Sequence, residues 1–198
     1  MIMVLDVGNS NTKCGLFEGD RLLHSWRMAT SVERSSDELG VTLTSFFNFV
    51  RENPSDVDGI MISSVIPSIN YTIEHMCRVF FKRKPLFVGP GIKTGINILY
   101  DNPRELGSDR IVNAVAAYEK YGGPCITVDF GTATSFGAIS AGGDFLGGVI
   151  CPGVKTASEA LTVNTAKLPR VELYKPKNII NRNTVGCMQA GIMYGYVG

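Results

Sequence analysis

Two short segments of the chain carry residue types that bind phosphate, in the same order. Residues 6–13 read Asp-Val-Gly-Asn-Ser-Asn-Thr-Lys, and residues 129–134 read Asp-Phe-Gly-Thr-Ala-Thr. The leading aspartate can hold a hydrated Mg²⁺, a hard ion that takes oxygen ligands and keeps several waters. The glycine lets backbone N–H groups approach a ligand closely, and the polar side chains that follow can donate to phosphate oxygens. One copy alone is commonly just a turn, whereas two copies predict a nucleotide site.

Strands must position both segments. The apolar residues 2–5 and 126–128, which precede them, are typical of central strands, and residues 12–17 and 134–139, which follow them, are again strand-like. Each copy is therefore predicted to be a β-hairpin. Two such hairpins can hold one polyphosphate from opposite sides.

Further elements extend the first hairpin into the order β-β-β-α-β-α-β. Ser35 or Ser36 can cap a helix whose apolar residues are three and four positions apart. The predicted elements are a strand at 21–28, that helix through Leu39, Leu43, Phe46, Phe47 and Val50, a strand at 59–65, a helix at 69–81 and a strand at 85–88.

The opening order of strands begins again after a predicted helix at residues 111–121. The three strands of this second series are expected at 126–129, 134–140 and 145–150. We therefore expect an α/β fold of two similar domains, residues 1–118 and 119–198, that face each other across a central cleft. The second has no closing elements after residue 150 and ends in a helical pattern at 194–198, so we expect it to be incomplete at its C-terminus.

Composition argues against several other kinds of protein. A formal net charge of +1 provides no basic surface for nucleic acid, and no apolar run is long enough to span a bilayer. The five cysteines include no Cys-x-x-Cys pair, which disfavours zinc and a disulfide framework. The chain opens on a strand without a leader pattern. We expect a cytoplasmic protein that binds neither nucleic acid nor membrane.

A third polar group lies between the two hairpins, at Gly107-Ser108-Asp109-Arg110, which we call the acceptor box. It leads directly into a predicted helix, and a helix N-terminus favours an anionic ligand. The planar guanidinium of Arg110 suits a carboxylate. An N-cap serine followed by ordinary first-turn charges explains the same residues, and this stretch alone does not separate the two interpretations.

The chain resembles the type III pantothenate kinases. Four motifs in the family's order carry the resemblance, namely residues 6–13, the acceptor box, residues 129–134 and residues 147–153, and Asn183-Thr184 with Gly186 and Gly191 continues it. The resemblance implies the actin, Hsp70 and sugar-kinase fold, which is ribonuclease H-like. It also implies ATP-dependent phosphorylation of pantothenate to 4'-phosphopantothenate, the first step towards coenzyme A, by a homodimer.

The same resemblance implies roles for individual residues, with Asp109 as the general base and Asp6 acting partly through Mg²⁺. Asp129 would bind a monovalent cation, K⁺ or NH₄⁺. The implied ATP-binding residues are Asp6, Val7, Gly8, Asn9, Ser10, Asn11, Thr12, Lys13 and Thr132. The implied pantothenate-binding residues are Tyr100, Gly107, Ser108, Asp109, Arg110 and, from the neighbouring subunit, Thr184.

The residues fit this chemistry independently of the family. Phosphoryl transfer to an alcohol mainly requires that the reacting groups are positioned, that the charge on the phosphoryl group is stabilised, and that a carboxylate accepts the hydroxyl proton. Asp109 is the best placed for that role, because Asp6 and Asp129 are expected to be engaged with cations. Two alternatives remain open: a kinase for another small hydroxylated acid or sugar, and a non-catalytic accessory regulator of gene expression.

Overall fold

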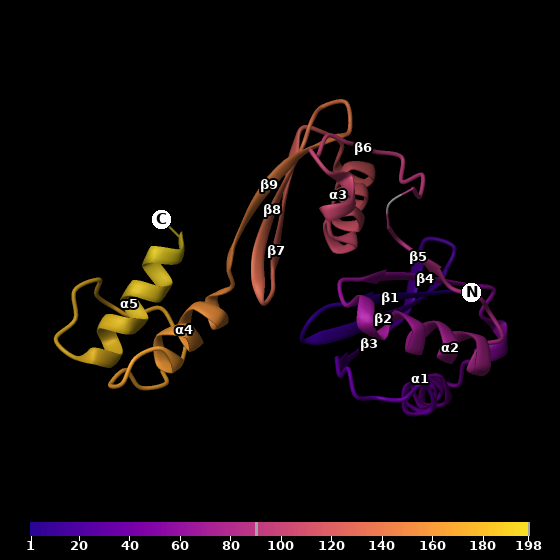
Figure 1. Cartoon of the computed structure of the whole chain (residues 1–198), viewed down its shortest axis with the longest axis horizontal. Coiled ribbons are helices and arrows are strands. Elements are labelled where there is room, and N and C mark those ends of the chain that lie inside the picture. Colours follow the sequence, from indigo (N-terminus) through magenta and orange to yellow (C-terminus); the bar gives the residue numbers. More distant parts are fainter. Residues whose placement is uncertain (90, 198) are drawn as a thin grey trace.

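The computed structural model describes residues 1–89 and 91–197, which form a mixed α/β fold with two β-sheets (Figure 1). The first sheet has the order β3-β2-β1-β4-β5. Its strands are β1 Ile2–Val7, β2 Asn11–Glu18, β3 Arg21–Ala29, β4 Gly59–Ser64 and β5 Leu86–Phe87. Strand β1 is central, antiparallel to β2 and parallel to β4. The predicted hairpin and the order β-β-β-α-β-α-β are confirmed.

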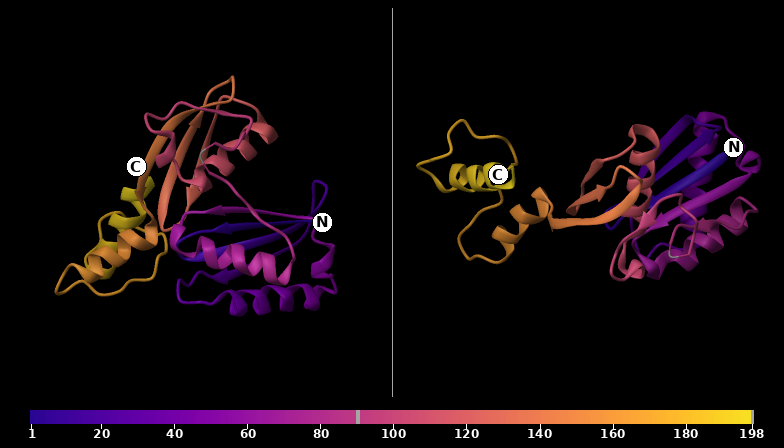
Figure 2. Two further views of the ribbon diagram at one scale, coloured as in Figure 1. Left: turned by 45° about the vertical axis from the view of Figure 1, so that its right-hand side comes forward. Right: turned by 90° about the horizontal axis from the view of Figure 1, so that it is seen from above.

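Two helices, α1 (Ser36–Val50) and α2 (Asn70–Phe80), lie side by side along one face of this sheet (Figure 2). A capping box at Ser35 begins α1, since Ser35 and Glu38 bond to each other's backbone N–H groups. Because side chains alternate between the faces of a strand, the core side chains of β1 point towards the helices: Met3, Leu5 and Val7. Asp6 therefore points to the opposite face.

The second sheet has the order β6-β9-β8-β7 and repeats the antiparallel meander of the first. Its strands are β6 Asn97–Ile98, β7 Cys125–Phe130, β8 Ala133–Ile139 and β9 Asp144–Pro152. Helix α3 (Ser108–Tyr121) packs against β7 and β8. The core between them is formed by Leu106, Ile111, Ala114, Ile139 and Phe145. Helices α4 (Val154–Val163) and α5 (Thr184–Val197) follow.

The structure differs from the sequence-based expectation in several places. Residues 126–128 were expected in a central strand, but β7 is an edge strand within the described residues, and Ile126 is 70% exposed. Helix α3 begins at Ser108 rather than at residue 111, which places the acceptor box in its first turn. Strand β6 and helix α4 were not predicted. Strand β6 and most of α3 lie before residue 119, yet both pack with the second sheet. No helix among the described residues has the length and apolar character needed to cross a membrane.

The close packing of α1 on α2 predicts an unusual response to alanine. A β-carbon at Gly40 would collide with the ring of Phe80. Overpacking costs ~1–3 kcal/mol, which outweighs the ~1 kcal/mol that alanine gains over glycine inside a helix. We expect Gly40→Ala to lower the free energy of unfolding measured by urea denaturation.

Gly191 in α5 provides the matched control, because its β-carbon position is open. Gly191→Ala should leave stability unchanged or raise it by up to ~1 kcal/mol. Equal effects of the two substitutions would contradict the packing argument.

Candidate active site

The turns that end the two hairpins touch each other. Ser10 Oγ, between β1 and β2, lies 3.0 Å from Thr132 Oγ1, between β7 and β8. This contact brings together two predicted ATP-binding residues that are 122 positions apart in the chain. The two segments predicted to bind phosphate therefore meet at the junction of the sheets.

The first turn presents free backbone donors. Gly8 N–H donates to Asn11 O at 3.0 Å and closes the turn. The N–H groups of Asn9 and Ser10, both exposed residues, donate to no other group in the described part of the chain. Two adjacent unpaired donors at the tip of a turn can bind phosphate oxygens in the manner of a backbone anion nest.

Asp6 and Lys13 are cross-strand neighbours in this hairpin. Lys13 Nζ lies 3.1 Å from Asp6 Oδ2, and the two side chains are 54% and 42% exposed. An ion pair this exposed contributes little to stability. Both groups can therefore change partners: the carboxylate to a cation and the ammonium to a phosphate.

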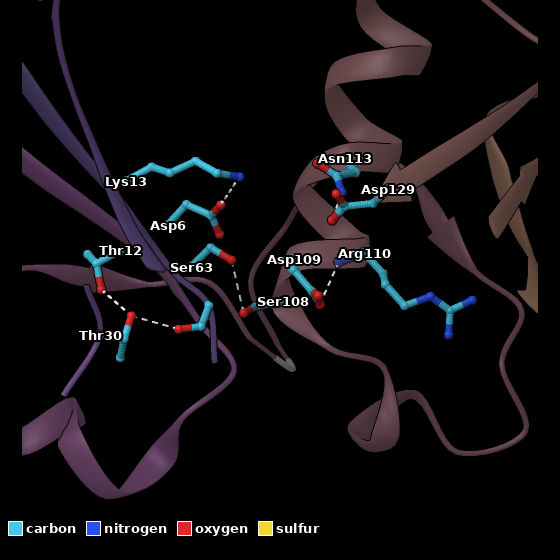
Figure 3. Close-up of polar contacts among 11 residues, drawn as sticks. Asp6, Thr12, Lys13, Thr30, Ser63, Ser108, Asp109, Arg110, Asn113 and Asp129 are labelled. Carbon is cyan, nitrogen blue, oxygen red and sulfur yellow. Dashed lines mark hydrogen bonds and ion pairs between the residues drawn. The ribbon is translucent and has the colours of Figure 1, made fainter. Parts of the chain in front are cut away.

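Two buried serines join the first sheet to helix α3. Ser63 Oγ donates to Ser108 Oγ at 3.1 Å (Figure 3). Ser108 Oγ in turn donates to Ser64 O at 3.0 Å. Ser63 is also the register partner of Asp6 across the parallel β1–β4 pair. Ser108, predicted to bind pantothenate, thus has its hydroxyl engaged with the first sheet, where it fixes the start of α3 beside Asp6.

Asp109 follows Ser108 in the first turn of α3. Its Oδ1 accepts a hydrogen bond from the backbone N–H of Arg110 at 2.8 Å. The lack of a side chain at Gly107 makes room for this carboxylate, since a β-carbon there would collide with Asp109 Oδ1. Burial raises the pKa of Asp109, and the negative charges of Asp129 and Asp6 raise it further, against the lowering effects of the Arg110 N–H and guanidinium.

Asp129 faces Asp109 from the end of β7. Its Oδ2 accepts a hydrogen bond at 3.3 Å from Asn113 Nδ2, one helical turn beyond Asp109 (Figure 3). Asp6, Asp109 and Asp129 thus approach one another from three elements, although no three Asp, Glu, His or Cys side chains in the described ranges form a ready-made metal centre. Mg²⁺ is commonly held by one or two carboxylates together with substrate phosphates, and the half-exposed Asp6 fits that pattern.

The guanidinium of Arg110 is buried beneath the second sheet. The residue is 8% exposed, and its charge lies over the rings of Tyr100 at 5.8 Å and Phe145 at 5.4 Å. Nη2 donates to Phe136 O at 3.3 Å and Nη1 to Tyr100 Oη at 3.4 Å, whereas Nε has no partner within the described residues. A β-carbon at Gly148 would collide with Arg110 Nη2 and Phe136 O.

Thr184 is the one predicted site residue that lies elsewhere. It is exposed at the first position of α5, and the last turn of that helix contacts β8 through Tyr196 and Thr134. At a rise of 1.5 Å per residue, Thr184 is about 18 Å along the helix axis from Tyr196. Helix α5 lies beyond the second sheet from α3 (Figures 1 and 2), so Thr184 does not join Asp109 within one chain.

Sequence reasoning missed three residues that build the site: Thr30, Ser63 and Asn113. Two of them could have been predicted from sequence patterns. Ser63 ends a buried strand parallel to β1, and the carboxyl ends of parallel strands meet at one edge. Asn113 lies four residues after Asp109, on the same helix face. Thr30 could not, because its contacts depend on tertiary packing.

Comparison with known proteins places the fold and then the family. A structure from Campylobacter jejuni, described as a conserved Baf family transcriptional activator, has a TM-score of 0.57 at 16% identity over 98% of this chain and 75% of its own. A 2-dehydro-3-deoxygalactonokinase protein from Sinorhizobium meliloti has a TM-score of 0.51 at 12% identity over 83% of this chain and 56% of its own. At these identities the likeness concerns the fold alone. The sequence model of the type III pantothenate kinases matches residues 2–198, and the chain therefore belongs to the type III pantothenate kinase family.

Proposed function

We propose that this chain binds ATP at the junction of the two hairpin turns and transfers the γ-phosphoryl group to pantothenate, giving 4'-phosphopantothenate. The observation that carries the proposal is the position of Asp109. Its half-buried carboxylate lies at a helix N-terminus between two phosphate-binding turns, with Asp6 and Asp129 close enough to influence its charge.

Each part of the site has a task in this reaction. The free N–H groups of Asn9 and Ser10 bind phosphate oxygens, and Lys13 leaves Asp6 to add positive charge to the phosphates. Asp109 accepts the proton of the attacking hydroxyl, and the N–H of Arg110 keeps its carboxylate oriented. Positioning and charge stabilisation of this kind account for most of the catalysis of phosphoryl transfer.

The carboxylates also suit the cations that the family uses. Asp6 would hold Mg²⁺ beside the phosphates, and Asp129, oriented by Asn113, would hold K⁺ or NH₄⁺. When bound, these ions supply positive charge near the transferring group.

Pantothenate is proposed to lie along the start of α3, with its carboxylate towards Arg110 and Tyr100. The partnerless Nε of Arg110 supports an anion there, because a buried donor without a partner is costly. Thr184 is distant from Asp109 within one chain, and this supports a homodimer in which Thr184 of the second copy completes the site. The repeated meander supports two actin-like domains, one built on each sheet, with a cleft between them.

The first test asks which molecule accepts the phosphoryl group. The chain supplied with ATP, Mg²⁺ and K⁺ is expected to release ADP when pantothenate is added, as measured by a coupled spectrophotometric assay. Parallel reactions with small hydroxylated acids and sugars serve as controls. A stronger response to one of those acceptors would replace pantothenate as the substrate, and ADP release with none of them would refute a small-molecule kinase.

The second test concerns the role of Asp109 as the general base. Asp109→Asn keeps the shape of the side chain and removes the proton acceptor, so kcat should fall by at least about 10²-fold while ATP affinity stays nearly unchanged. The matched control is Asp101→Asn, the same change at an exposed carboxylate of the preceding segment. Near-normal turnover of the Asp109 variant would exclude the general-base role.

The third test is the pH dependence of kcat/KM for pantothenate. Asp109 must be ionised to accept a proton, and its pKa is raised by burial and by its carboxylate neighbours. The acid limb of kcat/KM for pantothenate should therefore lie above the ordinary aspartate range of about pH 4. A K⁺ ion bound at Asp129 would compensate the negative charge of that carboxylate. Added K⁺ should therefore shift the acid limb of the kcat/KM profile to lower pH.

Asp129→Asn removes the same charge permanently. In this variant the limb should lie at lower pH than in the wild type without K⁺, and its position should no longer respond to K⁺. An acid limb that is the same with and without K⁺ in the wild-type protein would contradict the coupling between the two carboxylates.

A further inference from the structure

The turn between β1 and β2 is held from behind by Thr30, the residue that follows β3. The backbone N–H of Thr30 donates to Ser10 O at 3.1 Å, and its hydroxyl donates to Gly8 O at 2.8 Å. The same hydroxyl lies 2.9 Å from Thr12 Oγ1 (Figure 3). One side chain thus connects both ends of the phosphate-binding turn to the neighbouring strand.

The direction of this hydrogen-bond chain follows from counting protons. A hydroxyl has one hydrogen to donate, and that of Thr30 is directed to Gly8 O. Thr12 must then donate to Thr30. Thr12 is 8% exposed, so its hydroxyl is committed to Thr30 on the protein side of the turn and is not presented to a ligand.

These bonds also determine the direction in which a backbone N–H group of the turn points. In a trans peptide the C=O and the following N–H point in opposite directions. Because the carbonyl of Gly8 points at Thr30, the N–H of Asn9 points away from it, towards open solvent. The bond from the backbone N–H of Thr30 to the carbonyl of Ser10 fixes the next-but-one peptide as well, the one whose N–H belongs to Asn11.

We infer that Thr30 is a positioning residue for phosphate binding, which holds the carbonyls of Gly8 and Ser10 and thereby keeps the N–H of Asn9, between them, facing the nucleotide. It touches no ligand itself. This inference rests on the proposed function, in which the turn binds the phosphates of ATP. It also changes the role predicted for Thr12, whose hydroxyl holds Thr30 instead of binding ATP.

The test measures nucleotide binding without acceptor. Calorimetric titration with Mg²⁺ and a non-hydrolysable ATP analogue is expected to give a Kd about 10- to 30-fold weaker for Thr30→Val, the factor for losing two hydrogen bonds of ordinary strength. Thr30→Ser keeps the hydroxyl and should bind within about threefold of the wild type. The matched control is Thr42→Val, which removes a hydroxyl bond to Glu38 O inside α1, away from the turn.

Several outcomes would overturn the inference. These are wild-type affinity in Thr30→Val, or an equal loss in Thr30→Ser. If Thr30→Val does not fold, Thr12→Val replaces it, since that variant removes one of the same hydroxyl bonds, and unchanged affinity there counts against the inference as well. In turnover assays KM for ATP should rise while KM for pantothenate stays unchanged; a rise in both would indicate general loosening instead.

Failure of the proposed function is distinguishable from failure of this inference. A wild-type chain that binds the ATP analogue but phosphorylates no pantothenate would refute the proposed acceptor and leave the role of Thr30 standing. A wild-type chain that binds no nucleotide would refute both.

Discussion

The contact between Ser63, Ser64 and Ser108 is the interaction on which the geometry of the site depends. It is the buried bridge that joins the carboxyl end of β4 to the first turn of α3. Because β4 pairs with β1, the bridge determines how far Asp109 lies from Asp6. Hydroxyl pairs are short and uncharged, so they fix this distance without placing another charge among three carboxylates.

The concentration of negative charge at this junction would be costly without compensation. Lys13 compensates Asp6 from the neighbouring strand, an amide donor compensates Asp129, and the helix N-terminus with the N–H of Arg110 compensates Asp109. None of these partners is a buried cation in direct contact with the carboxylate. Like-charged groups held in this way are stabilised by added positive charge, and this fits the cations proposed to bind here.

The sequence predicted those features that local patterns encode. Both hairpins, helices α1 and α2 and the opening strand order follow from apolar periodicity and turn residues, and they are confirmed. The edge position of β7, the burial of Arg110 and the internal use of the Ser108 and Thr12 hydroxyls were not foreseen. The Thr12 and Ser108 hydroxyls meet partners 18 and 45 positions away in the chain, and Arg110 donates to a carbonyl 26 positions away. A hydroxyl side chain looks the same in sequence whether it faces a ligand or a strand.

Asp109 and Arg110 are consecutive residues whose side chains leave α3 in different directions. The carboxylate faces the junction of the sheets, and the guanidinium is fixed between Tyr100 and Phe145 beneath the second sheet. One helical turn therefore carries both the carboxylate at the junction and the buried cation. Under the proposed mechanism, acceptor recognition and proton transfer would lie one residue apart on the same backbone. A movement of this helical turn would therefore displace both groups together.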